Sequence, residues 1–400
     1  MNTPTFNRSD LYHRLQILGQ LYDLPSNWLE DKPNLFSTAV INLPATVDQE
    51  IKLVIQTLEQ IFNLPAYQSL ITKTDNCFNP GTPGVFMSYD FHLSPDGPKL
   101  IEINTNAGGS AFANLLYLAG ESLLQGKDSN RQPWEETVLA MFQHEWQLKR
   151  GKAPLQRIAI VDAHPETQPF YPEFLIFKAI FKSHGIDAII IDPSELILKN
   201  KKLVFQDSVI DLVYNRLTDF LLQEPQHEVL YTAYQKDYVV LTPHPYAYTR
   251  YANKRNLSWL SDTELLTSWG TKPEAVEVLQ RVIPPTINVD SRQSEALWED
   301  RKKLFFKPAS SFGGKGAFRG SKITRNTFAT IMQQNYIAQN YAPPSEISLK
   351  VDDQEETFKM DIRYYVYQDQ ILNKVARLYQ GQVTNFRSYG GGFALLRVEE

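Results

Sequence analysis

Strand and helix patterns alternate through residues 157–215, and this alternation restricts the fold more than any other feature of the sequence. The apolar runs RIAIV, DAIIID and VIDLVY are expected to form strands, and an amphipathic helix that ends before Gly185 separates the first two. Strand–helix–strand order is typical of a parallel sheet with right-handed crossovers. No G-x-G-x-x-G motif follows the first strand. The segment is therefore predicted to be Rossmann-like, without support for dinucleotide binding at that turn.

The flanking segments have different patterns. A chain of 400 residues is too long for one ordinary core. Residues 1–150 open with helices, one of them over 46–64, and then continue into an acidic hairpin. Residues 251–400 mix helices with strands. We therefore predict an α/β (α+β) protein with three parts, at 1–150, 151–250 and 251–400.

Composition excludes several classes of protein. The chain is 42% hydrophobic and carries 40 basic and 45 acidic residues, so it has ample apolar material for cores and is not expected to be disordered. The charges are evenly mixed, without the basic footprint that nucleic-acid binding requires. A single cysteine, Cys77, excludes an internal disulfide and a cysteine-based zinc site. The sequence shows no signal-like or membrane-spanning apolar run, so the expected location is the cytoplasm.

The acidic hairpin is the first candidate site. If Asp96 is the centre of its turn, residues at equal distances from it are paired, and Asp90 lies opposite Glu102. Directly opposed side chains have Cβ atoms about 4.5–5.5 Å apart. Asn104 projects from the same face, and such a set of oxygen donors suits Mg²⁺. The alternative is a hairpin whose carboxylates face bulk water, and a slip of one residue in register would separate the pair.

A lysine followed by a glycine-rich loop is the second candidate site. Lys307 ends an apolar strand and precedes Pro308 and the loop SSFGGKG. Glycines allow several backbone N–H groups to turn toward one anion, such as a phosphate. The spacing is not that of a Walker A motif. An ordinary flexible loop is the alternative.

Basic residues on a later pair of strands suggest a further anion site. Asp361 and Arg363 share one face of a predicted strand, and Arg377 lies on its hairpin partner. Arginine binds carboxylate or phosphate through two parallel hydrogen bonds. For each arginine taken singly, a surface ion pair is the alternative.

Together these segments resemble the ATP-grasp superfamily, which includes glutathione synthetases and D-alanine–D-alanine ligases. The resemblance covers roughly 150–400 and 85–118. The elements that match most of the family's pattern follow one another in its order: Asn253-Lys254, VIPPT, Lys307-Pro308 with Gly313 to Gly316, Ala338-Gln339-Asn340-Tyr341, Asp361-Ile362-Arg363, Arg377 and Asn385. Where many members have a glutamate near the adenine ribose, Asn340 stands here.

The metal motif that ends linear members of the superfamily appears upstream in this chain. It is similar to Asp90, Glu102 and Asn104 with the glycine turn that follows them. The chain therefore resembles a circularly permuted ATP-grasp fold, similar to eukaryotic glutathione synthetases and glutathionylspermidine synthases. Its Rossmann-like segment resembles the domain that precedes the ATP-grasp module in linear members.

The resemblance implies roles for individual residues. The residues expected to bind ATP are Lys254, Lys307, Ser311, Gly313, Gly314, Gly316, Gln339, Asn340 and Tyr341. The residues expected to hold Mg²⁺, as two ions, are Asp90, Glu102 and Asn104. The residues expected to act in catalysis are Arg363, Arg377 and Asn385.

The resemblance also implies an activity. This is ATP-dependent ligation of a carboxylate to an amine through an acyl phosphate, with release of ADP and phosphate. The expected substrates are small molecules, an amino acid or a small peptide, with no nucleic-acid or membrane partner, and an oligomer is left open. Loops such as those of His164 and Arg216 are candidates for substrate contacts. Two other functions stay open, a small-molecule kinase and an ATP-binding protein without turnover.

Overall fold

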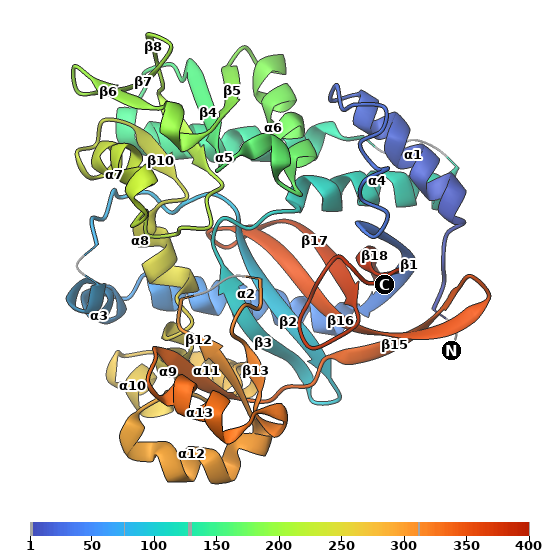
Figure 1. Ribbon diagram of the computed structural model, residues 1–400, viewed down its shortest axis with the longest axis vertical. Helices are drawn as coiled ribbons and strands as arrows, with labels where there is room; N and C mark the ends of the chain where they lie inside the picture. The colour runs from blue at the N-terminus through green and yellow to red at the C-terminus, as the bar shows by residue number, and fades with distance from the viewer. Residues whose placement is uncertain (1–2, 76, 127–129, 311–312, 400) are drawn as a thin grey trace.

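The computed structural model describes residues 3–75, 77–126, 130–310 and 313–399. Over these residues the strands form one seven-stranded sheet, two four-stranded sheets and a small three-stranded sheet. In Figure 1 the large sheet lies in the centre, with the parallel four-stranded sheet above it and the other four-stranded sheet below. Helices and strands are mixed throughout, which confirms the predicted α/β class. The predicted division into three parts stays a prediction.

The large sheet joins strands from both ends of the chain. Its order is β1-β18-β17-β16-β2-β3, and β15 pairs with the first half of β16. All pairs are antiparallel except β1 with β18. The strands are β1 (Phe36–Pro44), β2 (Met87–Ser94), β3 (Gly97–Asn104), β15 (Ser345–Val351), β16 (Gln354–Tyr367), β17 (Gln370–Tyr379) and β18 (Gly392–Glu399). The acidic hairpin β2–β3 therefore lies beside C-terminal strands, an arrangement that a permuted order requires. The circular permutation itself stays a prediction.

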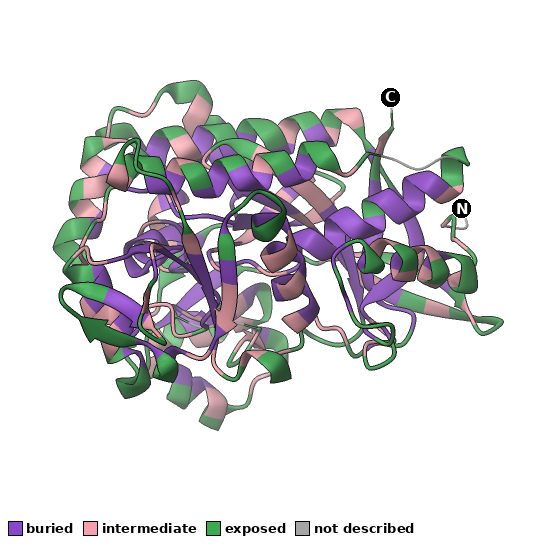
Figure 2. Cartoon of the chain, turned by 90° about the horizontal axis from the view of Figure 1, so that it is seen from above, coloured by how far each residue is buried: buried purple, intermediate pink, exposed green. Residues whose placement is uncertain are grey.

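Helices cover both faces of the large sheet. On one face α4 packs against β17 and β18, and on the other α2 packs against β1, β3 and β18. Successive strand residues alternate between the two cores, so that Tyr365 belongs to the α4 side and Tyr364 to the α2 side. Figure 2 shows the long helices with buried residues on one side and exposed residues on the other. The helices of this half are α1 (Arg8–Gln20), α2 (Ala45–Phe62), α3 (Pro65–Asp75), α4 (Ser110–Gln125) and α5 (Gln132–Arg150).

The helix predicted over 46–64 is confirmed as α2, but the opening of the chain is not purely helical. Strand β1 was not predicted, because a short apolar run with few polar positions does not show whether it is a strand or a buried helix. In the structure this run is a strand, because Val40 and Ile41 pair with Leu395 and Leu396 of β18.

The parallel sheet has the order β10-β9-β4-β5. Its parallel pairing confirms the prediction from the strand–helix–strand pattern, which gave no strand order. Its elements are β4 (Arg157–Val161), α6 (Tyr171–Ser183), β5 (Asp187–Ile191), β9 (Leu212–Asn215), α7 (Glu228–Gln235) and β10 (Val240–Thr242). Only the second half of VIDLVY joins this sheet. The run begins at the last residue of β8 (Ser208–Val209), which extends the small sheet of β6 (Ile197–Lys199) and β7 (Lys202–Phe205).

The second four-stranded sheet carries the lysine and the glycine loop. Its order is β11-β14-β12-β13, and its pairs are antiparallel. The strands are β11 (Thr286–Asn288), β12 (Leu304–Pro308), β13 (Phe318–Arg319) and β14 (Tyr336–Asn340). The helices of this region are α8 (Pro245–Ala247), α9 (Asn256–Leu260), α10 (Thr263–Ser268), α11 (Pro273–Val282), α12 (Ser294–Asp300) and α13 (Arg325–Met332). The glycine loop follows β12 directly.

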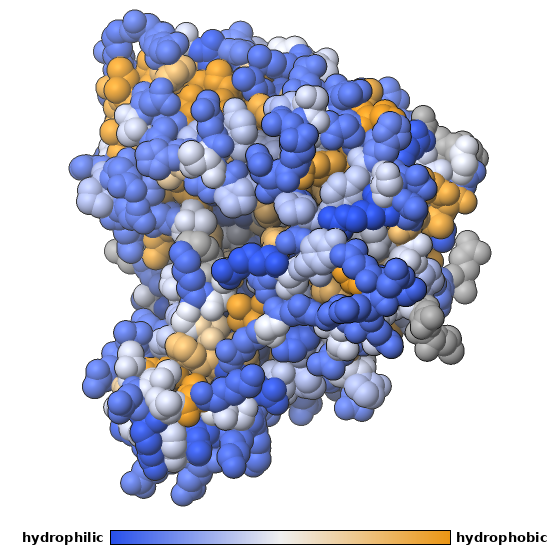
Figure 3. All heavy atoms as spheres, turned by 45° about the vertical axis from the view of Figure 1, so that its right-hand side comes forward, coloured by the Kyte–Doolittle hydropathy of each residue, from blue (hydrophilic) through white to orange (hydrophobic). Residues whose placement is uncertain are grey.

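The surface is predominantly polar on the face drawn in Figure 3, where hydrophobic residues form small separate groups. Within the described residues, no helix is both long and apolar enough to cross a membrane.

Candidate active site

The β2–β3 hairpin pairs Asp90 with Glu102, as predicted, although its turn differs from the predicted one. The turn contains two residues between Ser94 and Gly97, so Leu93 lies opposite Pro98, one residue earlier than expected. A bulge between Asp90 and Phe91 then adds one residue to β3 and restores the predicted pairing. A β-bulge places two residues opposite one and re-aims the side chains beyond it. The acidic pair therefore depends on the bulge as much as on the turn.

Asp90 lies at the centre of a buried network of ion pairs. Arg363 donates from Nε and Nη2 to its two carboxylate oxygens at 2.7 and 2.6 Å, and Arg377 donates from Nη2 at 2.9 Å. Arg377 also donates from Nε to Asp361 at 2.6 Å. Strand pairing produces this network, since Arg363 lies opposite Asp90 and Arg377 opposite Asp361.

The network fixes the charge of Asp90. The residue is 2% exposed, and this burial alone would raise the pKa of its carboxyl group. The charges of Arg363 and Arg377 act in the opposite direction and hold the pKa at about 2. Both carboxylate oxygens are thus engaged by arginines, and Glu102 is the more accessible carboxylate of the pair.

Glu102 faces a lysine across the site. Its side chain is 29% exposed, and the Nζ atom of Lys254 lies 3.7 Å from its Oε2 atom. Asn104 Nδ2 connects the two carboxylates, 3.2 Å from Asp90 and 3.3 Å from Glu102. Burial opposes ionisation of Glu102, but the positive charge of Lys254 lowers its pKa below the ordinary value. The three predicted metal-binding side chains therefore lie together, as the hairpin pattern indicated.

Lys307 reaches the same place from the other sheet. Its Nζ atom donates to the carbonyl oxygen of Ile101, the bulge residue, at 2.8 Å and to Gln339 Oε1 at 2.9 Å. Gln339 in turn donates to Thr286 at 3.1 Å. The lysine is 6% exposed, and burial lowers its pKa to about 8, although the charge of Glu102 partly opposes this shift. The acidic hairpin and the lysine thus meet in one site.

The lowered pKa of Lys307 predicts a pH-dependent stability. An unfolded lysine has a pKa of about 10.4, so from about 8 to about 10 the folded protein binds fewer protons and its stability rises with pH. In buffer with chelator and without nucleotide, we expect the wild-type protein to gain stability relative to Lys307→Met across this range. Urea unfolding of both proteins at successive pH values measures the effect. A difference that does not change with pH would contradict the burial of a charged amine.

The glycine loop lies against the loop that follows β17. Gly313, Gly314 and Gly316 have φ values of 60°, 69° and 70°, in the left-handed region that glycine adopts without strain. A Cβ atom on Gly314 would come within 2.8 Å of Val383, and the hydroxyl of Tyr336 donates to the carbonyl of Gly316 at 3.0 Å. Ser311 lies outside the described residues. The role of this loop in phosphate binding stays a prediction.

Of the residues predicted to form the adenine hinge, Gln339 is hydrogen-bonded to Lys307. Gln339 is buried beside Lys307, whereas Asn340 is exposed at the end of β14. The ring of Tyr341 stacks on Phe305 with centroids 6.1 Å apart. The guanidinium carbon of Arg319 lies over the Tyr341 ring, 4.3 Å from its centroid. The contacts of these residues with a nucleotide stay predictions.

Asn385 stabilises its own loop. Its Nδ2 atom donates to the carbonyl oxygens of Gln380 and Val383 at 2.8 and 3.2 Å, and its Oδ1 atom accepts from Arg387 N at 2.9 Å. In the part of the chain that the structure describes, its hydrogen bonds all lie within residues 380–388. The structure therefore gives Asn385 a local structural role, and its predicted catalytic role stays untested.

The two loop residues considered for substrate contacts differ in environment. Arg216 is buried and forms an ion pair with Glu173 at 3.0 Å. Glu173 also accepts hydrogen bonds from the backbone of Gly109 at 2.8 Å and Ala111 at 3.1 Å, at the start of α4. Arg216 thus anchors the glycine turn after the acidic hairpin, while His164 lies on the surface. Sequence patterns did not reveal the Glu173–Arg216 pair, because its partners come from different segments.

Solved structures of glutathione synthetase-like proteins share this fold. A glutathione synthetase-like effector from Globodera pallida matches 96% of this chain and 97% of its own with a TM-score of 0.57 and 11% identity. A protein from Methylobacillus flagellatus named as a gamma-glutamylcysteine synthetase matches 85% of each chain with a TM-score of 0.51 and 10% identity. No protein-family model and no curated protein sequence matches this chain. The likeness confirms the predicted glutathione synthetase-like architecture.

Proposed function

We propose that this protein is an ATP-dependent ligase that joins a carboxylate to an amine through an acyl phosphate. The observation that carries the proposal is the meeting of the acidic hairpin with two buried lysines, Lys307 from the other sheet and Lys254 from the turn before α9. Lys254 lies beside Glu102, and Lys307 is hydrogen-bonded to the carbonyl group of Ile101, the residue before Glu102. The two solved structures named above have names that refer to synthetases, which supports the same class of activity.

The donor set fits Mg²⁺ and a nucleotide. Glu102 is a partly exposed carboxylate whose pKa is lowered, chiefly by Lys254 acting against the effect of burial, so it is anionic at neutral pH. Glu102 and Asn104 would hold Mg²⁺, because hard oxygen ligands suit this ion. The bound ion would neutralise negative charge on the phosphates. Asp90 has both oxygens bonded to arginines, so we assign it chiefly to the orientation of those arginines.

The cationic residues would act on the phosphates. Lys254 lies 3.7 Å from Glu102 and Lys307 is bonded to the carbonyl group of Ile101, so both would hold the phosphates of ATP. Arg363 and Arg377 are held in fixed orientations by Asp90. Preorganised cations stabilise charge that develops in a transition state without having to reorient. They would therefore stabilise the transferred phosphoryl group and the tetrahedral intermediate.

A substrate screen tests the proposed function. Mg-ATP should raise the melting temperature, because a ligand that binds only the folded state stabilises it. Amino acids and small peptides, supplied singly and in pairs, should then include a pair that gives ADP, free phosphate and an amide detectable by mass spectrometry. A product that retains the phosphoryl group would indicate a kinase instead. Thermal stabilisation without turnover on any substrate would indicate an ATP-binding protein, and either result would contradict the ligase.

A further inference from the structure

One face of the second four-stranded sheet carries a row of polar side chains that ends at Lys307. Gln339 lies directly opposite Thr286 of β11 and Phe305 of β12, so these three side chains share one face of the sheet. Lys307 is two residues beyond Phe305 and therefore points to the same face. Thr286, Gln339 and Lys307 are all buried. The strand register thus places a hydroxyl, an amide and an ammonium group next to one another across three strands.

The hydrogen bonds of this row have a fixed direction. The Lys307 ammonium can only donate, so the atom of Gln339 that faces it at 2.9 Å is the amide oxygen. The amide nitrogen of Gln339 then donates to the hydroxyl oxygen of Thr286 at 3.1 Å. That hydroxyl donates to the carbonyl oxygen of Pro284 at 2.8 Å, and a carbonyl oxygen can only accept. The two ends of the row therefore hold the amide in a single orientation.

The side chain of Gln339 is poorly placed to contact a nucleotide itself. The residue is 2% exposed, and its amide oxygen and amide nitrogen are both bonded within the protein. The resemblance to ATP-grasp proteins assigned it to the adenine hinge, whose next residue, Asn340, is exposed. In the structure the charged group that Gln339 contacts is the lysine of the candidate site.

The Lys307 side chain needs support of this kind because it is long and flexible. A lysine ammonium is carried on a four-carbon stem and has three rotatable donors. In the part of the chain that the structure describes, two of the three are bonded, one to Gln339 and one to the carbonyl oxygen of Ile101 at 2.8 Å. These two acceptors belong to β14 and β3, in different sheets, so the ammonium is held between the sheets. The third N–H remains available to a ligand.

We propose that Gln339 and Thr286 are positioning residues that hold the Lys307 ammonium in the orientation in which its third N–H binds a phosphate oxygen of ATP. The proposal rests on the proposed ligase function and adds to it two residues that do not touch the nucleotide. A group that is held in place before the ligand arrives does not have to be ordered on binding, and this strengthens binding. With Ile101 as its only acceptor, the ammonium would rotate about a single hydrogen bond.

A double-variant cycle tests the proposal. Gln339→Met keeps the approximate size of the side chain and removes both hydrogen bonds. It should weaken binding of a non-hydrolysable ATP analogue with Mg²⁺, measured by calorimetry, by about tenfold, since hydrogen bonds to charged groups contribute on this scale. Lys307→Met should weaken binding at least as much. In a protein that already contains Lys307→Met, Gln339→Met should have no further effect, because it acts only through the lysine.

Thr286 supplies a second variant and a matched control. Thr286→Val keeps the shape of the side chain and removes the hydroxyl, so the amide of Gln339 is no longer held in one orientation. It should weaken binding of the analogue by about threefold, the scale of one neutral hydrogen bond. Thr286→Ser keeps the hydroxyl and should bind the analogue as the wild-type protein does. This pair decides the question even if Gln339→Met does not fold.

The outcomes separate this proposal from the function on which it rests. If Gln339→Met and Thr286→Val bind the analogue as tightly as the wild-type protein, the positioning role is overturned while the nucleotide site stands. An equal effect of Gln339→Met with and without Lys307 would also overturn it, since direct contact with the nucleotide or a general disturbance of the sheet acts in both backgrounds. If the wild-type protein binds no analogue, or if Lys307→Met binds it as tightly, the proposed phosphate site itself fails and this proposal fails with it.

Discussion

Glu102→Gln should lower the rate of ADP release by about 100-fold or more while leaving the protein folded, since groups that stabilise transition-state charge contribute on this scale. The substitution keeps the shape of the side chain and removes its charge. Glu102 is the accessible carboxylate of the hairpin and faces Lys254, so its charge is the one best placed to hold a metal ion next to the phosphates. Its contacts are long, 3.3 Å to Asn104 and 3.7 Å to Lys254, so the melting temperature should change little.

Steady-state ADP release and thermal unfolding, measured on the same preparations, check this prediction. Glu346→Gln is the matched control, because Glu346 is an exposed glutamate on β15 of the same sheet. It should behave as the wild-type protein in both measurements. A fully active Glu102→Gln protein would show that the hairpin does not hold the catalytic metal.

Asp90→Asn should cause the largest loss of stability, about 3–5 kcal/mol in the free energy of unfolding, which is the usual cost of breaking a buried ion pair. The substitution leaves the buried guanidinium group of Arg377 and the largely buried one of Arg363 without the anion to which both donate. Asp361 would still pair with Arg377, so Arg363 loses most. Activity should fall as well, because the arginines would no longer be held in place.

The pH dependence of the same variant gives a second measurement. The pKa of Asp90 is about 2 in the folded protein, below its ordinary value of 3.8. Its contribution to stability is therefore fully present above the ordinary value and is lost as the pH falls through about 2. The stability difference between wild-type and Asp90→Asn protein, from urea unfolding, should shrink as the pH is lowered from 5 toward 2. A difference that is small at pH 7, or constant with pH, would contradict the network.

A double variant provides the control. Asp90→Asn combined with Arg363→Met removes both charges of the pair and should recover part of the lost stability, because removing both charges of a buried ion pair costs less than leaving one of them unpaired. Asp353→Asn, at the exposed turn between β15 and β16, should leave stability nearly unchanged.

The Asp90–Glu102 pair agrees with the prediction, although the hairpin turn differs from the predicted turn. A three-residue turn centred on Asp96 predicts that Asp90 faces Glu102. The actual turn is one residue shorter, and the bulge at Ile101 restores the pairing. No local pattern in the sequence identifies that bulge. In the structure its carbonyl group is bonded to Lys307, so the bulge is tied to a contact across two sheets.

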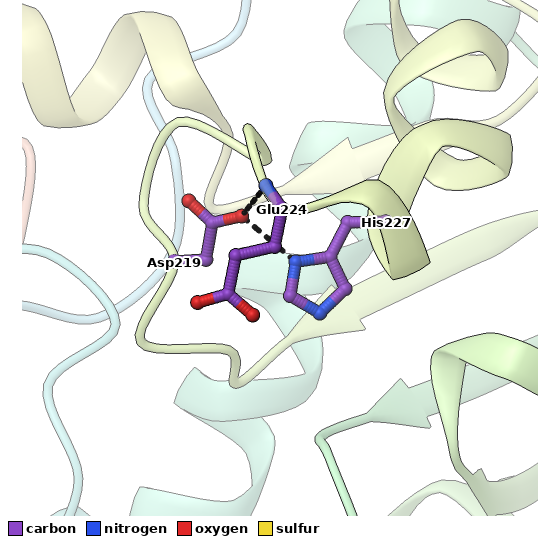
Figure 4. Close-up of side chains that lie close together, drawn as sticks. All are labelled: Asp219, Glu224 and His227. Atoms are coloured by element: carbon purple, nitrogen blue, oxygen red, sulfur yellow. Dashed lines mark hydrogen bonds and ion pairs between the residues drawn. The ribbon is translucent and has the colours of Figure 1, made fainter.

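Sequence patterns predicted the elements whose formation depends on a short stretch of chain. Hydrophobic periodicity identified α2, the strand–helix–strand order of the parallel sheet, and the strand pair that carries Asp361, Arg363 and Arg377. It missed β1, whose partner strand β18 lies at the other end of the chain. It also missed the cluster of Asp219, Glu224 and His227 (Figure 4), because the short segment between β9 and α7 that contains these residues has no periodic signal.

By itself, the sequence determined the types of the main elements and the chemical character of the candidate site, since periodicity and residue type are properties of short segments. Only the tertiary structure decided that Lys307 bonds to the bulge beside Glu102, that both arginines are bonded to Asp90, and that Gln339 connects Lys307 to Thr286. These features join residues that are far apart in the chain. Their positions depend on how whole sheets pack, and no short stretch of sequence contains that information.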